Sequence, residues 1–156
     1  MYSCVTHINM TKLLPAYVAG IVDGEGTLGI RCFKAKKTDA WSHYRPMIEI
    51  FNTHKELIDT LREFFGMGGC VYNRFDKNRK KTLYTIRVTG RNCLKILDFI
   101  EPYLIVKREQ ARVLRKMIAR VGNQGVKWSD SHRLIENNIR HSLYLEIRKL
   151  NSGYTE

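Results

Sequence analysis

Residues 12–24, with the sequence KLLPAYVAGIVDG, have two different faces when they are placed on a helix. Small residues recur at every fourth position, at Ala16, Gly20 and Gly24, so one face bears almost no side chain. The other face carries the larger apolar residues Leu13, Leu14, Tyr17, Val18 and Ile21. We therefore predict a helix that packs its larger apolar residues in the chain's own core and leaves the bare face for a second helix.

Two pairs of segments with alternating apolar residues follow, and each pair predicts a β-hairpin. In the first pair, Leu28, Ile30 and Cys32 alternate with Thr27, Gly29, Arg31 and Phe33, and Ile48 and Ile50 alternate with Met47, Glu49 and Phe51. The second pair is CVYNRF, residues 70–75, and TLYTIRV, residues 82–88. The connecting segments, KAKKTDAWSHYR and DKNRKK, are both basic. The sequence thus predicts two hairpins with basic tips.

The remaining segments have helical periodicity. Thr53 and Glu56 have the spacing of a capping box, in front of an apolar stripe that ends at Gly66. A short helix is stopped before Pro102, and a loop at residues 121–131 separates a longer helix from a last one. The stripe that ends at Gly66 consists of Leu57, Ile58, Leu61, Phe64 and Phe65. The stripe of the longer helix consists of Val106, Gln110, Val113, Leu114, Met117, Ile118 and Val121, and that of the last helix consists of Leu134, Ile135, Ile139, Leu143 and Ile147.

The order of helix, two strands, helix and two strands predicts an α+β fold. Helices should cover one face of an antiparallel sheet, and the other face should stay free. A chain of 156 residues can bury roughly 70% of its unfolded surface, so it needs no disulfide or structural metal to fold. One domain is expected. We assign residues 1–10 to an N-terminal extension and residues 11–156 to a single domain.

The four cysteines, Cys4, Cys32, Cys70 and Cys93, show neither CxxC spacing nor paired histidines, so neither a zinc site nor a disulfide framework is predicted. We expect buried, reduced thiols. The sequence has no run of about 18 apolar residues, and its start lacks the basic head and apolar core of a signal peptide. We therefore expect a soluble, intracellular protein without a membrane partner or a small-molecule substrate.

The charge of the chain indicates what it binds. Lysine and arginine number 27 against 15 acids, which gives a net charge of +12 and favours a polyanionic partner over an ordinary basic surface. Two of the acids, Asp23 and Glu25, fall at the C-terminal end of the first predicted helix. Because the helix dipole is negative there and destabilises a carboxylate, we expect a positive group beside them.

The residues VAGIVDGEG, positions 18–26, resemble the nine-residue signature of the LAGLIDADG homing endonucleases. The predicted order of elements is also similar to the αββαββα core of that family, from about residue 13 to residue 121. In the family, two such helices pack against each other at a domain or subunit interface, and the last acid of each motif binds the metal that cleaves DNA. That place is held here by Glu25, where the family usually has Asp.

The resemblance implies a site for Mg²⁺, or for another divalent cation such as Mn²⁺ or Ca²⁺. Hard cations take oxygen ligands, and we expect the Glu25 carboxylate with the Gly24 carbonyl as a weaker ligand. The segment PYLIVKREQ matches the context of the family's active-site lysine and implies that Lys107 organises water or stabilises the transition state. A polar residue at the end of the second strand implies a water-positioning role for Asn52. Asp23 is either a further ligand or a hydrogen-bonding residue at the helix end.

The resemblance further implies that the free sheet face lies along double-stranded DNA. Side chains that point outward from the strands can meet base edges in the major groove, while basic tips meet phosphates. The strand candidates are Arg31, Phe33, Arg45, Met47, Glu49, Tyr72, Arg74, Leu83, Thr85 and Arg87, and the tip candidates are Lys34, Lys36, Lys37, Lys77, Arg79, Lys80 and Lys81. For any single one of them, a solvated surface charge is the competing interpretation.

Only one copy of the motif is present, and single-motif members of the family dimerise through its helix. We therefore expect a homodimer whose interface contains Ala16, Gly20 and Gly24 and whose target is pseudo-palindromic. The expected activity is a double-strand break by metal-dependent phosphodiester hydrolysis, in the cytoplasm or an organelle of an intron-bearing host. Two alternatives stay open, namely an RNA maturase that assists intron splicing and a non-cleaving DNA-binding regulator of the same fold.

Overall fold

The computed structural model describes residues 14–33, 42–66, 69–76, 80–121 and 129–153. The elements follow in the order α1 (Pro15–Glu25), β1 (Gly26–Phe33), β2 (His43–Asn52), α2 (Lys55–Phe65), β3 (Gly69–Asp76), β4 (Lys81–Thr89), α3 (Asn92–Ile100), the 3-10 turn η2 (Glu101–Tyr103), α4 (Arg108–Val121) and α5 (Asp130–Ser152). This order confirms the predicted α+β fold.

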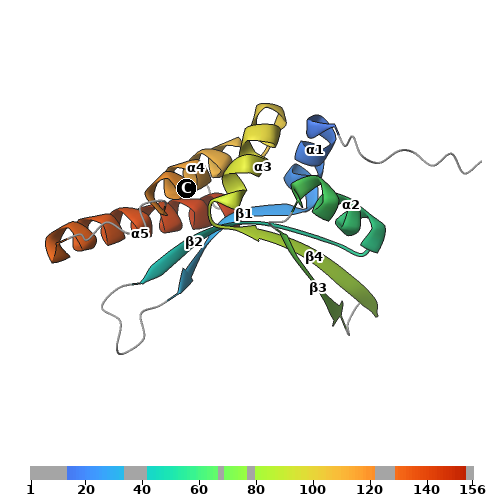
Figure 1. The fold of residues 1–156 in the computed structure, drawn as a ribbon, viewed down its shortest axis with the longest axis horizontal. Coiled ribbons are helices and arrows are strands. Elements are labelled where there is room, and N and C mark those ends of the chain that lie inside the picture. Colours follow the sequence, from blue (N-terminus) through green and yellow to red (C-terminus); the bar gives the residue numbers. More distant parts are fainter. Residues whose placement is uncertain (1–13, 34–41, 67–68, 77–79, 122–128, 154–156) are drawn as a thin grey trace, which may run out of the picture.

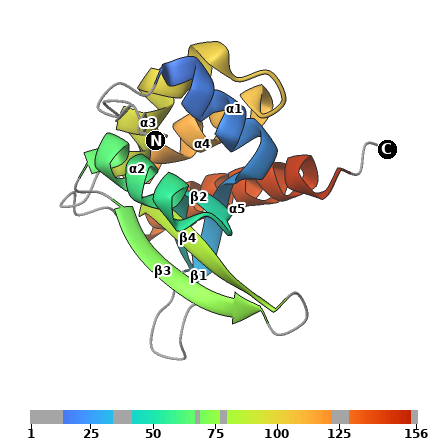
Figure 2. The ribbon, with the colours of Figure 1, turned by 90° about the vertical axis from the view of Figure 1, so that its right-hand side faces the viewer.

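The four strands form one antiparallel sheet in the order β1-β2-β4-β3. Figure 1 shows the sheet as an arch with all the helices on its convex side, and Figure 2 shows the curved strands β3 and β4 below α2. Two hairpins meet in the middle of the sheet, where Ile48 of β2 lies opposite Leu28 of β1 and Val88 of β4. No described element covers the concave face, as the sequence predicts.

The core lies between the sheet and the helices. Alternation buries one side of β1, β2 and β4, as the sequence predicts, whereas β3 contributes only the partly buried Val71. Every α-helix adds apolar side chains to the same cluster. Its fully buried members include Leu28, Ile48, Ile50 and Ile86 from the sheet and Val22, Leu61, Leu97, Leu114 and Ile147 from the helices. Within the described residues, no helix is both long and apolar enough to cross a membrane.

The predicted orientation of α1 is wrong in part. The buried residues of α1 are Val18, Ala19 and Val22, whereas Leu14 is 70% exposed and Tyr17 is 53% exposed. On a helix, Tyr17 lies about 100° around the axis from Val18, so a face centred on Val18 and Val22 turns Tyr17 away from the sheet. The helix begins at Pro15, with Leu14 as its extended N-cap, so the predicted start at residue 12 is wrong. It ends at Glu25 with Gly26 as its C-cap, one residue later than predicted.

The predicted capping box of α2 is also wrong. The helix begins at Lys55 with His54 as its N-cap, so Glu56 is the second helical residue and not the third, as a capping box requires. In its place, the backbone N–H of His54 donates a hydrogen bond to Oδ1 of Asn52 at 2.9 Å. The end of α2 is as predicted, because Gly66 adopts a φ of 66°, which favours glycine.

The apolar stripes of the last two helices are shorter than predicted. Val106 precedes α4 and is exposed, and Leu134 and Ile135 are exposed on the first turns of α5, which extend past the sheet (Figure 1). Only Leu143 and Ile147 of α5 are buried. The loop predicted at residues 121–131 extends too far, because α5 already starts at Asp130. Ser129 is the N-cap of α5, and its Oγ accepts a hydrogen bond from the His132 N–H. Asp76 and Lys81, which are predicted in the connection between the last two strands, belong to β3 and β4.

The thiols differ in burial. Cys93 is buried and Cys32 is partly buried, but Cys70 is exposed at the start of β3, so the expectation of burial is wrong for that residue. All three are free of disulfides, and Cys4 lies outside the described residues. Burial raises the pKa of Cys93 to about 12, which keeps its thiol protonated and able to donate to the Val88 carbonyl.

The burial pattern of α5 gives a stability prediction. Truncating Ile147 to Ala should lower the free energy of unfolding by about 2–5 kcal/mol, because the side chain is lost from a packed interior. Leu134→Ala, on the exposed part of the same helix, should change it by less than about 0.5 kcal/mol. Urea denaturation of both variants measures this, and equal losses would contradict the placement of α5.

Candidate functional site

Asp23 holds the start of α4 at the end of α1. Its Oδ2 accepts hydrogen bonds from the backbone N–H groups of Ile105 at 2.7 Å and Val106 at 3.2 Å, and its Oδ1 accepts one from Lys107 at 3.0 Å. Burial alone would raise the pKa of Asp23, but these three hydrogen bonds and the nearby charge of Lys107 lower it below its ordinary value. Of its two expected roles, the structure shows the hydrogen-bonding one.

Lys107 supplies the positive group that is expected at the end of α1. Its Nζ donates hydrogen bonds to the Val22 carbonyl at 2.9 Å and to the Asp23 carbonyl. The ammonium thus lies against the negative end of the helix dipole, although it belongs to a segment more than 80 residues further along the chain. Burial lowers the pKa of Lys107, and the Asp23 carboxylate partly offsets this effect.

Glu25 and Asn52 lie at the same end of the sheet. Glu25 is the exposed last residue of α1, and the next residue, Gly26, is paired with Ile50 of β2. Asn52 therefore lies two residues beyond that pair, and it ends the strand opposite Tyr84 of β4. Its Oδ1 is held by the His54 N–H, which leaves the amide nitrogen to donate to another group.

The oxygen atoms at the end of α1 fit one part of a metal site. The Val22 and Asp23 carbonyls are taken by Lys107 and the Gly26 N–H, so the Glu25 carboxylate and the Gly24 carbonyl are the oxygens that suit a hard cation. Among the described residues, no cluster of three or more histidine, cysteine or acidic side chains could hold a metal ion. One chain thus offers only part of a coordination shell.

The small-residue face of α1 is open. Ala16, Gly20 and Gly24 are all exposed, and a Cβ atom built at either glycine would meet nothing within 4 Å. Exposed apolar residues border this face, both on α1 itself and on the segment that Asp23 holds. They are Leu14, Tyr17, Ile105 and Val106. The predicted interface residues therefore lie on a surface that no other described part of the chain covers.

The concave sheet face contains a hollow of about 400 Å³. Its lining consists of Glu49, Phe51, Tyr72, Arg74, Leu83, Thr85 and Arg87. All of these except Phe51 are predicted DNA contacts. Phe51 lies two residues after Glu49 on β2 and therefore on the same side of the strand, so the alternation of that strand could have predicted it as well. Thr85 lies on the predicted face but is only 5% exposed.

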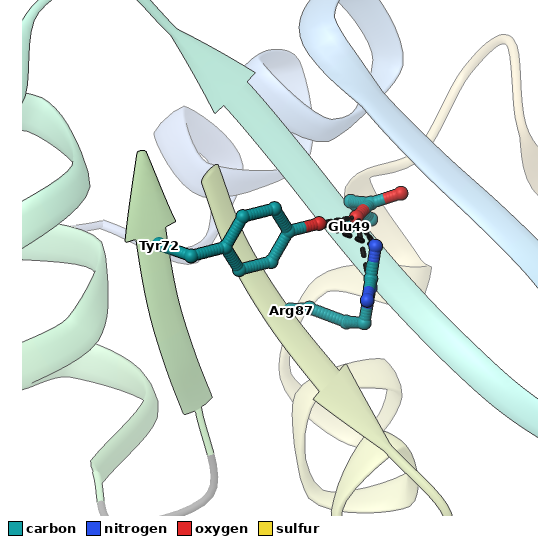
Figure 3. A network of polar contacts seen from close by, with 3 residues as sticks. All are labelled: Glu49, Tyr72 and Arg87. Carbon is teal, nitrogen blue, oxygen red and sulfur yellow. Dashed lines mark hydrogen bonds and ion pairs between the residues drawn. The ribbon is translucent and has the colours of Figure 1, made fainter. Parts of the chain in front are cut away.

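Three residues of this hollow form a network that spans three strands (Figure 3). The Tyr72 hydroxyl and the Arg87 guanidinium both donate to Oε1 of Glu49, the Arg87 Nε at 2.8 Å. Burial raises the pKa of Tyr72, and its hydrogen bond to Glu49 and the charge of Glu49 raise it further, whereas Arg87 has the opposite effect. The phenol therefore remains a proton donor at neutral pH.

The other predicted DNA contacts are distributed along the rest of the concave side. Arg31, Phe33 and Arg45 are exposed at the β1–β2 end, where the Arg45 guanidinium lies 5.4 Å from the centre of the Phe33 ring. Met47 is partly exposed, and Lys80 and Lys81 are exposed at the β3–β4 end. Lys34, Lys36, Lys37, Lys77 and Arg79 lie outside the described residues.

The described residues thus form an α+β domain with an exposed acid at the end of α1, an open helix face and an open sheet face that carries arginines. The chain belongs to the LAGLIDADG endonuclease family, whose sequence profile matches residues 18–117, well over half of its length. This confirms the family that the motif indicates. The matched segment ends within α4, so α5 lies beyond it. A comparison with curated proteins finds no match.

Solved structures of homing endonucleases share the fold. The chain is similar to I-CvuI in complex with the I-CreI target, with 22% identity and a TM-score of 0.68 over 91% of this chain and 84% of that one. An archaeal intron-encoded homing endonuclease, I-Vdi141I, complexed with DNA, has 15% identity and a TM-score of 0.72 over 91% of this chain and 86% of that one. I-SmaMI bound to cleaved DNA has 20% identity and a TM-score of 0.66, but the match covers 87% of this chain and only 43% of that one.

The contacts of Asp23 predict a loss of stability on substitution. Asp23→Asn should lower the free energy of unfolding by about 0.5–2 kcal/mol, as the loss of a helix-capping residue does. Asp59→Asn, which removes an exposed ion pair with Lys55, should have a smaller effect. Denaturation at neutral pH measures both variants.

The same variant has a predicted pH dependence. Because folding lowers the pKa of Asp23, its carboxylate stabilises the native state above the unfolded pKa, and this contribution is lost as the pH falls through the folded pKa. The difference between wild type and Asp23→Asn should therefore shrink in acid. Unchanged stability at neutral pH would assign Asp23 a role other than capping.

Proposed function

We propose that the protein is a site-specific homing endonuclease that makes a double-strand break in a long pseudo-palindromic DNA target, as a homodimer and by metal-dependent phosphodiester hydrolysis. The observation that carries this proposal is the end of α1, where an exposed Glu25 carboxylate and a partly buried Lys107 ammonium occur beside an open helix face. Family membership and the DNA complexes of I-CvuI and I-Vdi141I support it.

In this proposal, Glu25 and the Gly24 carbonyl hold a divalent cation. When bound, such a cation supplies an activated water and neutralises the charge that develops on the phosphate. Lys107 is fixed at the same helix end by two carbonyls and places a second positive charge near the phosphate. Asn52 keeps its amide nitrogen free to orient water, because its oxygen is held by His54.

The homodimer follows from the incomplete site and the uncovered face. Each chain offers one carboxylate, and a second copy packed on the small-residue face would bring a second Glu25 to the same place. Ile105 and Val106, 78% and 70% exposed, extend that surface beyond α1 with apolar side chains that a partner can bury. The match covers 84% of I-CvuI but only 43% of I-SmaMI, which is consistent with one copy of the fold in this sequence.

The DNA would lie along the concave face. The major groove admits a two-stranded ribbon whose side chains point toward the bases at every second residue. The uncovered strands of the concave face and its exposed arginines suit this arrangement. At neutral pH, the net charge of +12 favours association with DNA and makes binding sensitive to salt.

Glu25→Gln tests the catalytic assignment. The variant should lose cleavage and keep site-specific binding, because the shape is retained while the only exposed carboxylate at the end of α1 is removed. Targets selected from randomised duplexes in Ca²⁺ can then be tested for cleavage in Mg²⁺. Lys107→Met should slow cleavage less than Glu25→Gln does, whereas Glu63→Gln, at an exposed acid near the end of α2, should cut like wild type. A Glu25→Gln protein that cuts both strands at the wild-type rate would refute this site.

Gly20→Leu tests the dimer. Among the described residues, a Cβ atom at Gly20 meets no heavy atom within 4 Å, and leucine favours a helix more than glycine does, so the variant should fold with equal or higher stability. It should nevertheless sediment as a monomer and lose double-strand cleavage, while Ala119→Leu, on the exposed face of α4, should stay dimeric. Wild type that remains monomeric at micromolar concentration, both free and on DNA, would contradict the proposal.

A further inference from the structure

Glu49, Tyr72 and Arg87 come from three different strands and meet on the concave face. Glu49 lies directly opposite Arg87 in the pairing of β2 with β4, and Tyr72 of β3 lies opposite Thr85, two residues before Arg87. Alternate residues share one face of a strand, so all three side chains rise on the same side and converge (Figure 3). We call these three residues the arginine triad.

The triad fixes the guanidinium of Arg87 in one orientation. Its Nε and Nη2 donate to Oε1 of Glu49, Nη2 also donates to the Tyr72 hydroxyl, and the guanidinium carbon lies 4.9 Å from the centre of the Tyr72 ring. An arginine has five N–H donors in a rigid plane. The Nη1 amino group is therefore the part of Arg87 that remains available to a ligand in the hollow.

The electrostatics of the triad keep Arg87 in place. The side chains of Arg87 and Glu49 are only 22% and 16% exposed, so their attraction is screened less than that of a surface ion pair. If Arg87 turned toward a phosphate, Glu49 would be left partly buried, unpaired and beside a polyanion, which is costly. The pair is also neutral as a whole, so it contributes little to the general attraction for DNA.

Arg74 shows the contrast on the same face. It is exposed beside the triad in the lining of the hollow, and within the described residues it has no hydrogen bond or ion pair. A free arginine can follow a phosphate, whereas one that is held by a carboxylate and a phenol presents a fixed donor. Fixed donors suit the reading of base edges.

We infer that the arginine triad is a pre-assembled reader of one guanine in each half-site, in which Arg87 contacts the base while Glu49 and Tyr72 are positioning residues. Guanine is the base that presents two acceptors, O6 and N7, and no donor in the major groove, so it matches a group that only donates. The inference rests on the proposed function, because it takes the concave face as the DNA surface.

The test is a base-preference profile, measured by selection from randomised duplexes, for wild type and triad variants. Arg87→Met should lose the preference for one guanine per half-site, on the order of tenfold. Glu49→Gln should weaken the same preference while tightening binding to unrelated DNA, because a negative charge is removed. Tyr72→Phe should weaken it less, since the aromatic ring remains.

The double variant Glu49→Gln with Arg87→Met preserves the net charge of the triad. It should therefore keep the wild-type salt dependence of binding. Its loss of guanine preference should equal that of Arg87→Met alone, because the two residues act as one unit. Arg74→Met is the matched control on the same face. It should weaken binding to all sequences alike and reduce the salt slope by about one.

Three results would overturn the inference while leaving the proposed function intact. Glu49→Gln could change the preferred base at a different position, which would make Glu49 itself the reader. Arg87→Met could weaken all sequences alike and reduce the salt slope, which would make Arg87 a phosphate contact. The profiles of all triad variants could equal that of wild type, which would leave the triad a structural role. A wild-type protein that selects no sequence at all would instead refute the proposed function, and the inference with it.

Discussion

The rest of the site depends on the reciprocal contact between the end of α1 and the start of α4. The Asp23 carboxylate binds three N–H groups just before α4, where the helix dipole is positive, and the Lys107 ammonium binds two carbonyls at the end of α1, where it is negative. The Asp23 charge thus satisfies N–H groups of the segment that leads into α4, and the Lys107 charge adds hydrogen bonds to carbonyls of the last turn of α1. The two helix ends are thereby fixed relative to each other, and Glu25 is carried on the same rigid element.

This contact also explains why two acids so close in sequence have different surroundings. Asp23 is partly buried, and its two oxygens accept three backbone hydrogen bonds, so the carboxylate is held as an anion against the start of α4. Glu25, two residues further along α1, is exposed and keeps its oxygens available. Lys107 contributes to both surroundings, because it neutralises the helix end that would otherwise repel the Glu25 carboxylate.

Local patterns predicted the strands and the concave face well, because alternation along a strand directly decides which side each residue faces. Periodicity was less reliable for helices, since it cannot say how a helix is rotated against its neighbours, and Tyr17 and Leu14 were misplaced for that reason. The role of Asp23 could not be decided from the sequence, because its three partners lie 82 to 84 residues away. The triad was predicted only as three separate outward side chains, since the register between β2, β3 and β4 decides which of them meet.

The distribution of ion pairs shows why DNA would approach the sheet and not the helices. Ion pairs such as Arg115 with Glu101 and Arg120 with Glu136 join residues of the helical layer, whereas Arg87 with Glu49 lies on the sheet. Acids therefore cancel much of the positive charge on the convex side, whereas Arg31, Arg45 and Arg74 stay exposed on the concave side. A positive field on the concave side orients a polyanion before any base is contacted. The neutral triad in the middle of that field can then contribute to base recognition without adding to the attraction for DNA in general.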